Sequence, residues 1–234
     1  MFKYKTIISS FIILYSFSCS SNKAPSKKES NIPQSIELFD GKTLSGWKTI
    51  SFEGEGGRVV VNDNKIVLER GEPFTGIVID DKNFHPPSDE YEINIKARKT
   101  EGRDFFCALT FPVPEKHSCC TFVAGAWGGQ VTGLSNIDYL DANRNSTRSI
   151  LKYETDKWYN IKVEITYGRI RCWIDDRIVV NTLIDKKIIS MRPGAIEACQ
   201  PFGIASYETR AEFESITLKS VRIFLIVIHQ QISL

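Results

Sequence analysis

Asp104 is the residue whose neighbours best suit acid–base chemistry. It follows Gly102 and Arg103 and directly precedes the apolar pair Phe105 and Phe106. A neighbouring cation and neighbouring apolar side chains can both shift the pKa of a carboxylate. Carboxylates at catalytic sites are commonly tuned in this way. We therefore predict Asp104 as a catalytic residue with Arg103 as its partner. A structural ion pair or a turn cap formed by the same two residues is the alternative.

One tryptophan has neighbours that suit a binding role. Trp127 lies at the centre of the segment GAWGG, residues 125–129. Glycine allows backbone bends that other residues avoid, so a large ring can be displayed at such a position. An aromatic face then offers an apolar platform for the C–H surface of a sugar ring. The pattern predicts a stacking platform, and a core tryptophan at the end of a strand is the alternative.

A loop rich in side-chain oxygens follows this tryptophan. Asp138, Asp141 and Asn145 can bind sugar hydroxyl groups, and we predict all three as substrate-binding residues. Asp141 also begins the pattern D-x-N-x-N of a calcium loop, but Ser146 and Lys152 replace the turn glycine and the bidentate glutamate of an EF-hand. This excludes an EF-hand and leaves a looser site for a divalent cation such as calcium. A loop in which these side chains cap their own backbone is the alternative.

Composition excludes two other classes of function. The chain has three histidines and no C-x-x-C or H-E-x-x-H spacing, which argues against a zinc site. Residues 30–234 contain 25 Lys and Arg against 27 Asp and Glu. A domain with this balance lacks the positive excess that binds nucleic acid.

The elements that must position these residues are β-strands. Residues 91–97 and 161–165 alternate between apolar and polar side chains, the period of a half-buried strand. Residues 105–111 and 119–124 are more continuously apolar, as strands covered on both faces are. No segment has the period of a long amphipathic helix. The pattern predicts an all-β fold, an antiparallel jelly-roll sandwich spanning residues 36–221.

Residues 1–19 have the anatomy of an export signal. A short basic segment precedes an apolar stretch that is too short to span a membrane. The segment resembles a bacterial lipoprotein signal in which Cys19 is lipidated, although Ser16 stands where leucine is usual. A plain cleaved secretory signal is the alternative. Residues 20–35 are predicted as a flexible tether and 222–234 as an apolar C-terminal tail. We expect a protein of the cell envelope that is lipid-anchored, with the outer membrane favoured, or periplasmic.

Several segments, in order, resemble one protein family. They read LFDGKTLSGW at residues 38–47, GRDFFCALTFP at 102–112 and PFGIASYET at 201–209. They are similar to blocks of the 3-keto-disaccharide hydrolase family, also called DUF1080. The likeness extends over about residues 36–218. The resemblance implies a concanavalin A-like jelly roll of the lectin and glucanase type.

The same resemblance implies an activity. Members of the family act on 3-keto-disaccharides, so we expect an exported hydrolase or lyase of 3-keto-glycosides. A carbonyl at C3 acidifies the C2 proton, so one base and one group that stabilises an enediolate can expel the anomeric substituent. The expected partners are a carbohydrate substrate and a membrane reached through the lipid anchor, without nucleic acid. A non-catalytic carbohydrate-binding lipoprotein and a protein-interaction lipoprotein are the alternatives.

Overall fold

The computed structural model describes residues 35–80 and 90–221. By its contacts the chain divides into two units, residues 1–32 and 33–234, and the described residues all belong to the second. The predicted signal peptide with Cys19, nearly all of the predicted tether and the predicted apolar tail lie outside the described residues. Within them, no helix is both long and apolar enough to cross a membrane.

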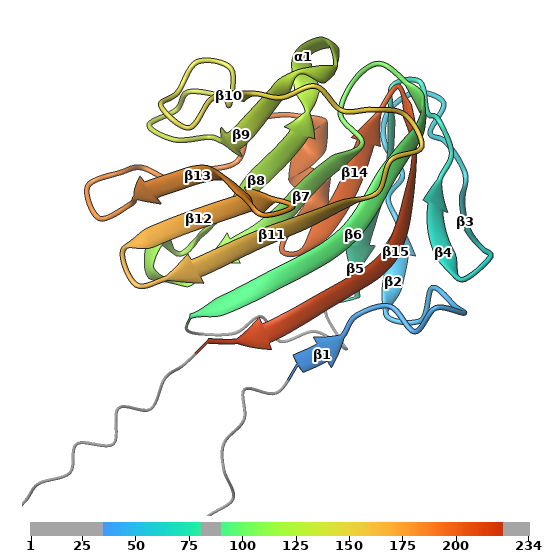
Figure 1. Cartoon of the computed structure of the whole chain (residues 1–234), viewed down its shortest axis with the longest axis horizontal. Helices are drawn as coiled ribbons and strands as arrows, with labels where there is room; N and C mark the ends of the chain where they lie inside the picture. Colours follow the sequence, from blue (N-terminus) through green and yellow to red (C-terminus); the bar gives the residue numbers. More distant parts are fainter. Residues whose placement is uncertain (1–34, 81–89, 222–234) are drawn as a thin grey trace, which may run out of the picture. The chain divides into compact units, whose positions relative to one another are not determined.

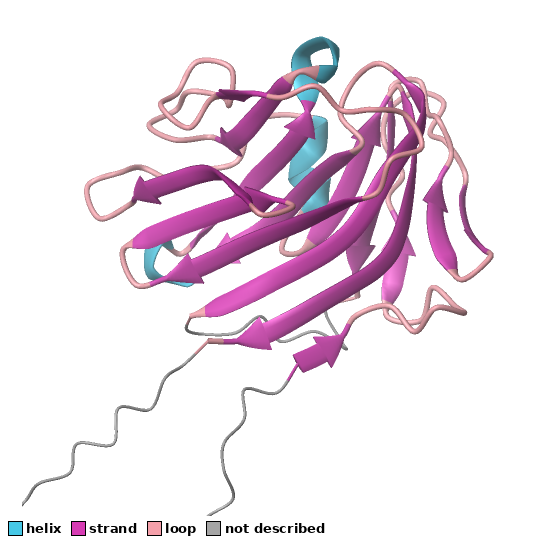
Figure 2. Ribbon diagram, in the orientation of Figure 1, coloured by secondary structure: helices cyan, strands magenta, loops and turns pink. Residues whose placement is uncertain are grey.

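Two antiparallel β-sheets form the fold (Figure 1, Figure 2). The eight-stranded sheet contains, in spatial order, β13 (Arg177–Leu183), β12 (Arg169–Ile174), β11 (Tyr159–Thr166), β6 (Tyr91–Gly102), β15 (Thr209–Ser220), β4 (Lys65–Leu68) and β3 (Val59–Asn62), with β1 (Ser35–Glu37) also paired to β15. The seven-stranded sheet contains β10 (Ser149–Ile150), β9 (Val131–Ser135), β8 (Ser118–Gly125), β7 (Cys107–Val113), β14 (Gly203–Tyr207), β5 (Phe74–Ile79) and β2 (Trp47–Thr49). The short helices of the described part are η1 (Pro114–Lys116), α1 (Ala126–Gly129) and η2 (Ala195–Cys199). The predicted antiparallel jelly-roll sandwich is confirmed.

The eight-stranded sheet follows the simple alternation of its sequence. On β6, Tyr91, Ile93 and Ile95 are buried, and on β11 Ile161 and Val163 are buried, while the residues between them face outward. Successive side chains of a strand point to opposite faces, so one face of this sheet enters the core between the sheets and the other carries polar groups. The two alternating strands predicted from the sequence are confirmed.

The seven-stranded sheet is apolar on both faces. Leu109 and Phe122 belong to the large core between the sheets. Their neighbours Ala108 and Val123 belong to a second apolar cluster, which also contains Ala205 of β14. Because neighbouring residues of a strand face opposite ways, this second cluster lies on the outer face of the sheet. The continuously apolar runs of the sequence therefore reflect a sheet that is covered on both sides, and the outer cover includes η2.

Cysteines contribute to the core as small apolar residues. All five cysteines in the described part are buried and free, and none forms a disulfide: Cys107, Cys119, Cys120, Cys172 and Cys199. Burial raises the pKa of Cys107 and of Cys199 to about 12. Since the thiolate is the reactive form, these two side chains are inert as nucleophiles at neutral pH.

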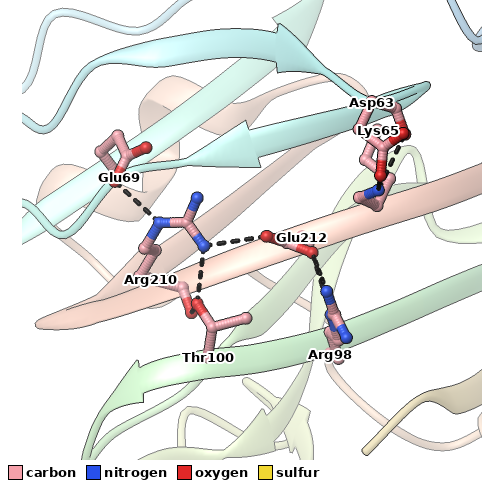
Figure 3. A network of polar contacts seen from close by, with 7 residues as sticks. All are labelled: Asp63, Lys65, Glu69, Arg98, Thr100, Arg210 and Glu212. Atoms are coloured by element: carbon pink, nitrogen blue, oxygen red, sulfur yellow. Dashed lines mark hydrogen bonds and ion pairs between the residues drawn. The ribbon is translucent and has the colours of Figure 1, made fainter. Parts of the chain in front are cut away.

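A charged network covers part of the outer face of the eight-stranded sheet (Figure 3). Glu212 accepts hydrogen bonds from Arg98 at 2.7 Å and from Arg210 at 2.8 Å. Arg210 also donates to Glu69 at 2.9 Å and to Thr100 at 2.8 Å. The Glu212 side chain is 9% exposed, whereas those of Arg98 and Arg210 are 26% and 20% exposed. Glu212 is thus the buried centre of the network, and its two arginines keep partial contact with water.

Replacing Glu212 by glutamine is expected to lower the free energy of unfolding by about 2 kcal/mol at pH 7. This is less than the loss from a fully buried pair, because both arginines remain partly hydrated. Burial raises the pKa of Glu212, but its bonds to Arg210 and Arg98 outweigh burial and hold the pKa below the ordinary 4.5. The stabilisation is therefore complete at neutral pH and disappears as the pH falls through the folded-state pKa.

Urea unfolding of the two proteins at pH 7 and below pH 4.5 measures this difference. Glu53→Gln, at an exposed position, is the matched control and should leave the midpoint unchanged at both pH values. A Glu212→Gln effect that is the same at both pH values would contradict the assignment.

Candidate functional site

A pocket of about 440 Å³ opens on the outer face of the seven-stranded sheet. Strands β5, β7, β8, β9 and β14 contribute to its lining, together with the connection between β6 and β7, α1, the start of η2 and the two residues 192–193 before it. The lining residues are Phe74, Asp104, Phe105, Ala108, Thr121, Val123, Ala126, Trp127, Ser135, Arg192, Pro193, Ala195, Ile196 and Tyr207. The volume lies within the range of about 300–1,000 Å³ that is usual for small-molecule sites.

Aromatic rings form one wall of the pocket. The rings of Phe74 and Tyr207 meet edge to face at 4.9 Å between centroids, and Phe105 lies 5.6 Å from Tyr207. Phe74 in turn stacks on Phe52 at 5.1 Å. Each of these contacts fixes a ring, so the wall is preformed. Such a wall suits the apolar face of a sugar ring.

Hydroxyl groups lie in the floor of the pocket. Thr121 and Ser135 are 2% and 3% exposed. The Oγ1 atoms of Thr121 and Thr110 lie 2.9 Å apart, and the Ser135 hydroxyl donates to the Asn136 side-chain oxygen at 2.8 Å. Hydroxyl oxygens keep acceptor capacity after such bonds, so the floor can accept hydrogen bonds from ligand hydroxyl groups.

Asp104 is fixed beside the pocket by backbone hydrogen bonds. Its Oδ1 accepts the Phe105 N–H at 2.9 Å, and its Oδ2 accepts the Gly128 N–H at 2.8 Å. The Thr209 hydroxyl accepts the Asp104 N–H at 3.2 Å and donates to its carbonyl at 3.1 Å. Each carboxylate oxygen retains a lone pair after these bonds. Among the described lining residues, Asp104 is the one carboxylate.

Arg103 does not take the place predicted for it. Its side chain is exposed and lies outside the pocket lining, and no ion pair joins it to Asp104 in the described part of the chain. The carbonyl of Arg103 instead lies 2.7 Å from where a Cβ would stand at Gly129. The predicted Arg103–Asp104 partnership is therefore wrong: two backbone N–H groups satisfy the carboxylate, and Arg103 contributes its backbone to close packing.

Trp127 is displayed at the rim of the pocket. It has a left-handed backbone with φ of 49°, and Gly125, Gly128 and Gly129 also have positive φ, at 82°, 79° and 92°. A bulky residue in this region is strained, and such strain is concentrated at functional sites. The indole is 36% exposed, and the Arg192 guanidinium lies 5.5 Å from its centroid. Glycines on both sides thus allow the turn to present the ring to the pocket.

The oxygen-rich loop lies apart from this pocket. None of its three predicted residues is among the lining residues. Asp138 pairs with Lys187 at 2.7 Å, a hydrogen bond that lowers the pKa of Asp138, and Asp141 pairs with Arg144 at 2.9 Å. Both acids are therefore already neutralised by cations of the protein.

Asn145 is buried and makes its hydrogen bonds within the protein. Its amide nitrogen donates to the carbonyls of Leu134 at 2.7 Å and Leu140 at 2.9 Å. Its oxygen accepts from the Thr147 backbone at 2.8 Å and from the Thr147 hydroxyl at 2.6 Å. These contacts agree with the alternative given for the loop, in which its side chains form hydrogen bonds to the backbone around them. Within residues 35–80 and 90–221, no three His, Cys, Asp or Glu side chains are grouped as metal ligands.

Arg192 and Tyr207 are pocket residues that sequence reasoning missed. Arg192 comes from the irregular segment after β13, where no periodicity indicates which side chains face inward. Tyr207 lies inside the PFGIASYET block, two residues after Ala205 on β14, so the alternation of a strand places both side chains on the outer face of the sheet.

Comparison with known proteins decides the family. The model of the 3-keto-alpha-glucoside-1,2-lyase-like domain matches residues 34–219. The chain belongs to this family. The resemblance inferred from the sequence blocks is confirmed, and membership indicates a carbohydrate-related hydrolase or binding domain. No curated protein matches the chain in sequence.

Solved structures share the fold. A Parabacteroides distasonis protein provisionally described as a glycosyl hydrolase has 18% identity and a TM-score of 0.50, with 80% of this chain and 94% of that one covered. A protein from work on endo-acting O-glycanases of the human gut microbiota has 15% identity and a TM-score of 0.51, covering 81% and 99%. The Crh5 transglycosylase has 8% identity and a TM-score of 0.52, covering 81% and 85%. At these identities the likeness shows the architecture alone.

Proposed function

We propose that the pocket binds a 3-keto-glycoside and cleaves its glycosidic bond by elimination, with Asp104 as the general base. The observation that carries the proposal is the position of Asp104. It is the one carboxylate among the described lining residues, and it lies at the foot of the turn that displays Trp127. A base with fixed geometry and free lone pairs is what the removal of a carbon-bound proton requires.

Elimination from a 3-keto-glycoside needs a single base, because only the C2 proton is removed. The C3 carbonyl acidifies the C2–H, and Asp104 takes that proton while the electron pair moves into an enediolate. Collapse of the enediolate forms the C1–C2 double bond, restores the carbonyl and breaks the bond from C1 to the glycosidic oxygen. The departing oxygen takes a proton from protonated Asp104 or from water and leaves as an alcohol. Addition of water across the new double bond completes a net hydrolysis, and release before hydration makes the reaction a lyase.

Turnover of 3-keto-trehalose by the purified protein tests this proposal. We expect release of glucose, whereas trehalose itself should remain intact because its C2 proton is not acidified. In deuterium oxide the hydrolysis product should carry deuterium at C2, since elimination and hydration exchange that hydrogen. Direct hydrolysis of the acetal would leave C2 unlabelled. If neither 3-keto-trehalose nor a set of 3-keto-α- and 3-keto-β-glucosides is cleaved, with or without added calcium, the enzymatic proposal is wrong.

A carbohydrate-binding protein without turnover is the second candidate, favoured by the exposed indole at the rim of the pocket. Under either function, Trp127→Ala is expected to weaken sugar binding about three- to tenfold, the usual contribution of one aromatic contact. Isothermal titration with the sugar, or KM for a cleaved substrate, measures the change. Trp127→Phe keeps a ring and should recover most of the affinity. Equal affinity of Trp127→Ala and the unaltered protein would remove the indole from the binding site.

We also propose that the protein is exported and anchored to the cell envelope through lipidated Cys19. The proposal rests on the basic and apolar segments that precede this cysteine. Cell fractionation with palmitate labelling tests it: the unaltered protein should carry label in the membrane fraction, and Cys19→Ala should carry none. Unlabelled protein in the periplasm would indicate a plain secretory signal instead.

A further inference from the structure

Arg192 is the one cation among the described residues that line the pocket. It is exposed and belongs to the irregular segment between β13 and η2, and it lines the pocket without being part of either sheet. Its guanidinium carbon lies 5.5 Å from the centroid of the Trp127 ring, the geometry of a cation–π contact. The aromatic face orients the guanidinium without using its N–H donors.

Those donors have no anionic partner within the protein. In residues 35–80 and 90–221, no carboxylate forms an ion pair with Arg192, whereas Arg98, Arg144 and Arg171 each pair with one and Arg210 pairs with two. A guanidinium has five N–H donors in a planar fork that fits oxygen anions. Arg192 therefore presents to the occupant of the pocket a positive charge that has no ion-pair partner among the described residues.

Arg192 and Asp104 meet at the same turn. Asp104 binds the Gly128 N–H at 2.8 Å, and the residue before that glycine is Trp127, over which Arg192 lies. A base and a cation thus border one small volume without forming an ion pair with each other. Removal of a proton beside a carbonyl needs this combination, because the negative charge that the base creates appears on the carbonyl oxygen.

We propose that the Arg192 guanidinium binds the C3 oxygen of the sugar and stabilises the enediolate that forms when C2 is deprotonated. This rests on the elimination proposed above and identifies what the pocket selects: a ring oxidised at C3. A sugar with a hydroxyl at C3 develops no negative charge on that oxygen. Arg192 therefore stabilises only the transition state of a sugar that carries a carbonyl at C3. The contact strengthens as charge develops, and its main effect is therefore on kcat rather than on KM.

Kinetics of arginine variants on 3-keto-trehalose test the assignment. Arg192→Gln is expected to lower kcat about 10²- to 10³-fold, the usual loss when one donor to a developing oxyanion is removed. KM should change less than about threefold. Arg192→Lys keeps the positive charge but not the planar fork of N–H donors. Its kcat should lie between that of Arg192→Gln and that of the unaltered protein. Guanidinium ion added at millimolar concentration should raise the rate of Arg192→Ala and leave the unaltered protein unaffected.

Arg177→Gln, at the exposed first residue of β13, is the matched control and should retain full kcat. Thermal unfolding of each variant separates catalytic loss from loss of fold. If Arg192→Gln keeps kcat within about threefold, or raises KM alone, the assignment is wrong while the role of Asp104 stands. If guanidinium restores nothing to a folded Arg192→Ala, the assignment is wrong as well. If the unaltered protein cleaves no 3-keto-glycoside, the elimination and the role of Arg192 fall together.

Discussion

Asp104→Asn is expected to lower kcat for 3-keto-trehalose about 10²- to 10⁴-fold, the range that general-base catalysis contributes. The amide cannot accept the C2 proton. It also has one oxygen where the carboxylate has two, so it can accept only one of the two N–H groups that now bind Asp104, those of Phe105 and Gly128. Part of the loss can therefore come from movement of the turn that displays Trp127.

Chemical rescue separates the two effects. Formate should restore a measurable part of the rate of Asp104→Ala if the missing function is a base, and should restore nothing if the loss comes from the displaced turn. Asp176→Asn, at an exposed position in the turn between β12 and β13, is the matched control and should keep full activity. An Asp104→Asn protein with kcat within about threefold of the unaltered enzyme would exclude Asp104 as the base.

Asn145→Ala is expected to lower the free energy of unfolding by about 3 kcal/mol. The amide makes four hydrogen bonds and Asn145 is 8% exposed, so its removal breaks its bonds to the Leu134 and Leu140 carbonyls and to the backbone N–H and hydroxyl of buried Thr147. In a domain of this size the loss corresponds to a decrease in Tm of about 6–12 °C. Differential scanning calorimetry measures it.

Asn143→Ala is the control within the same loop. Its side-chain oxygen accepts one hydrogen bond from Arg148 at 3.0 Å in an exposed setting, so we expect a loss below about 1 kcal/mol. An unchanged Tm for Asn145→Ala together with weaker sugar binding would return Asn145 to the substrate-binding role that its sequence pattern indicates.

The fold was predictable because its signal is local. Alternation of apolar and polar residues in β6 and β11 depends on the geometry of a single strand, and the structure confirms both. The continuously apolar stretch that becomes β7 and β8 was also interpretable, since only a sheet covered on both faces tolerates it. Neither inference required knowledge of which strands pair.

The candidate site was predictable only in part. Asp104 lies between a glycine and an apolar run, and Trp127 lies among glycines, so short sequence segments were enough to single out both residues. Both line the pocket. The partner of Asp104 was not predictable in this way. Its carboxylate binds Gly128, twenty-four positions further along the chain, and sequence proximity pointed wrongly to Arg103.

The sequence by itself determined the sandwich, the family and two residues that line the pocket, because each depends on short-range pattern or on ordered motifs. Only the tertiary structure decided which polar residues share one pocket. It brought Arg192 from an irregular segment to the Trp127 ring, and it directed the Asp138, Asp141 and Asn145 side chains to partners within their own surroundings. The physical reason is that a polar side chain can act on a ligand only where its internal hydrogen bonds leave donors or lone pairs unused and facing the pocket, and that depends on pairings between distant segments.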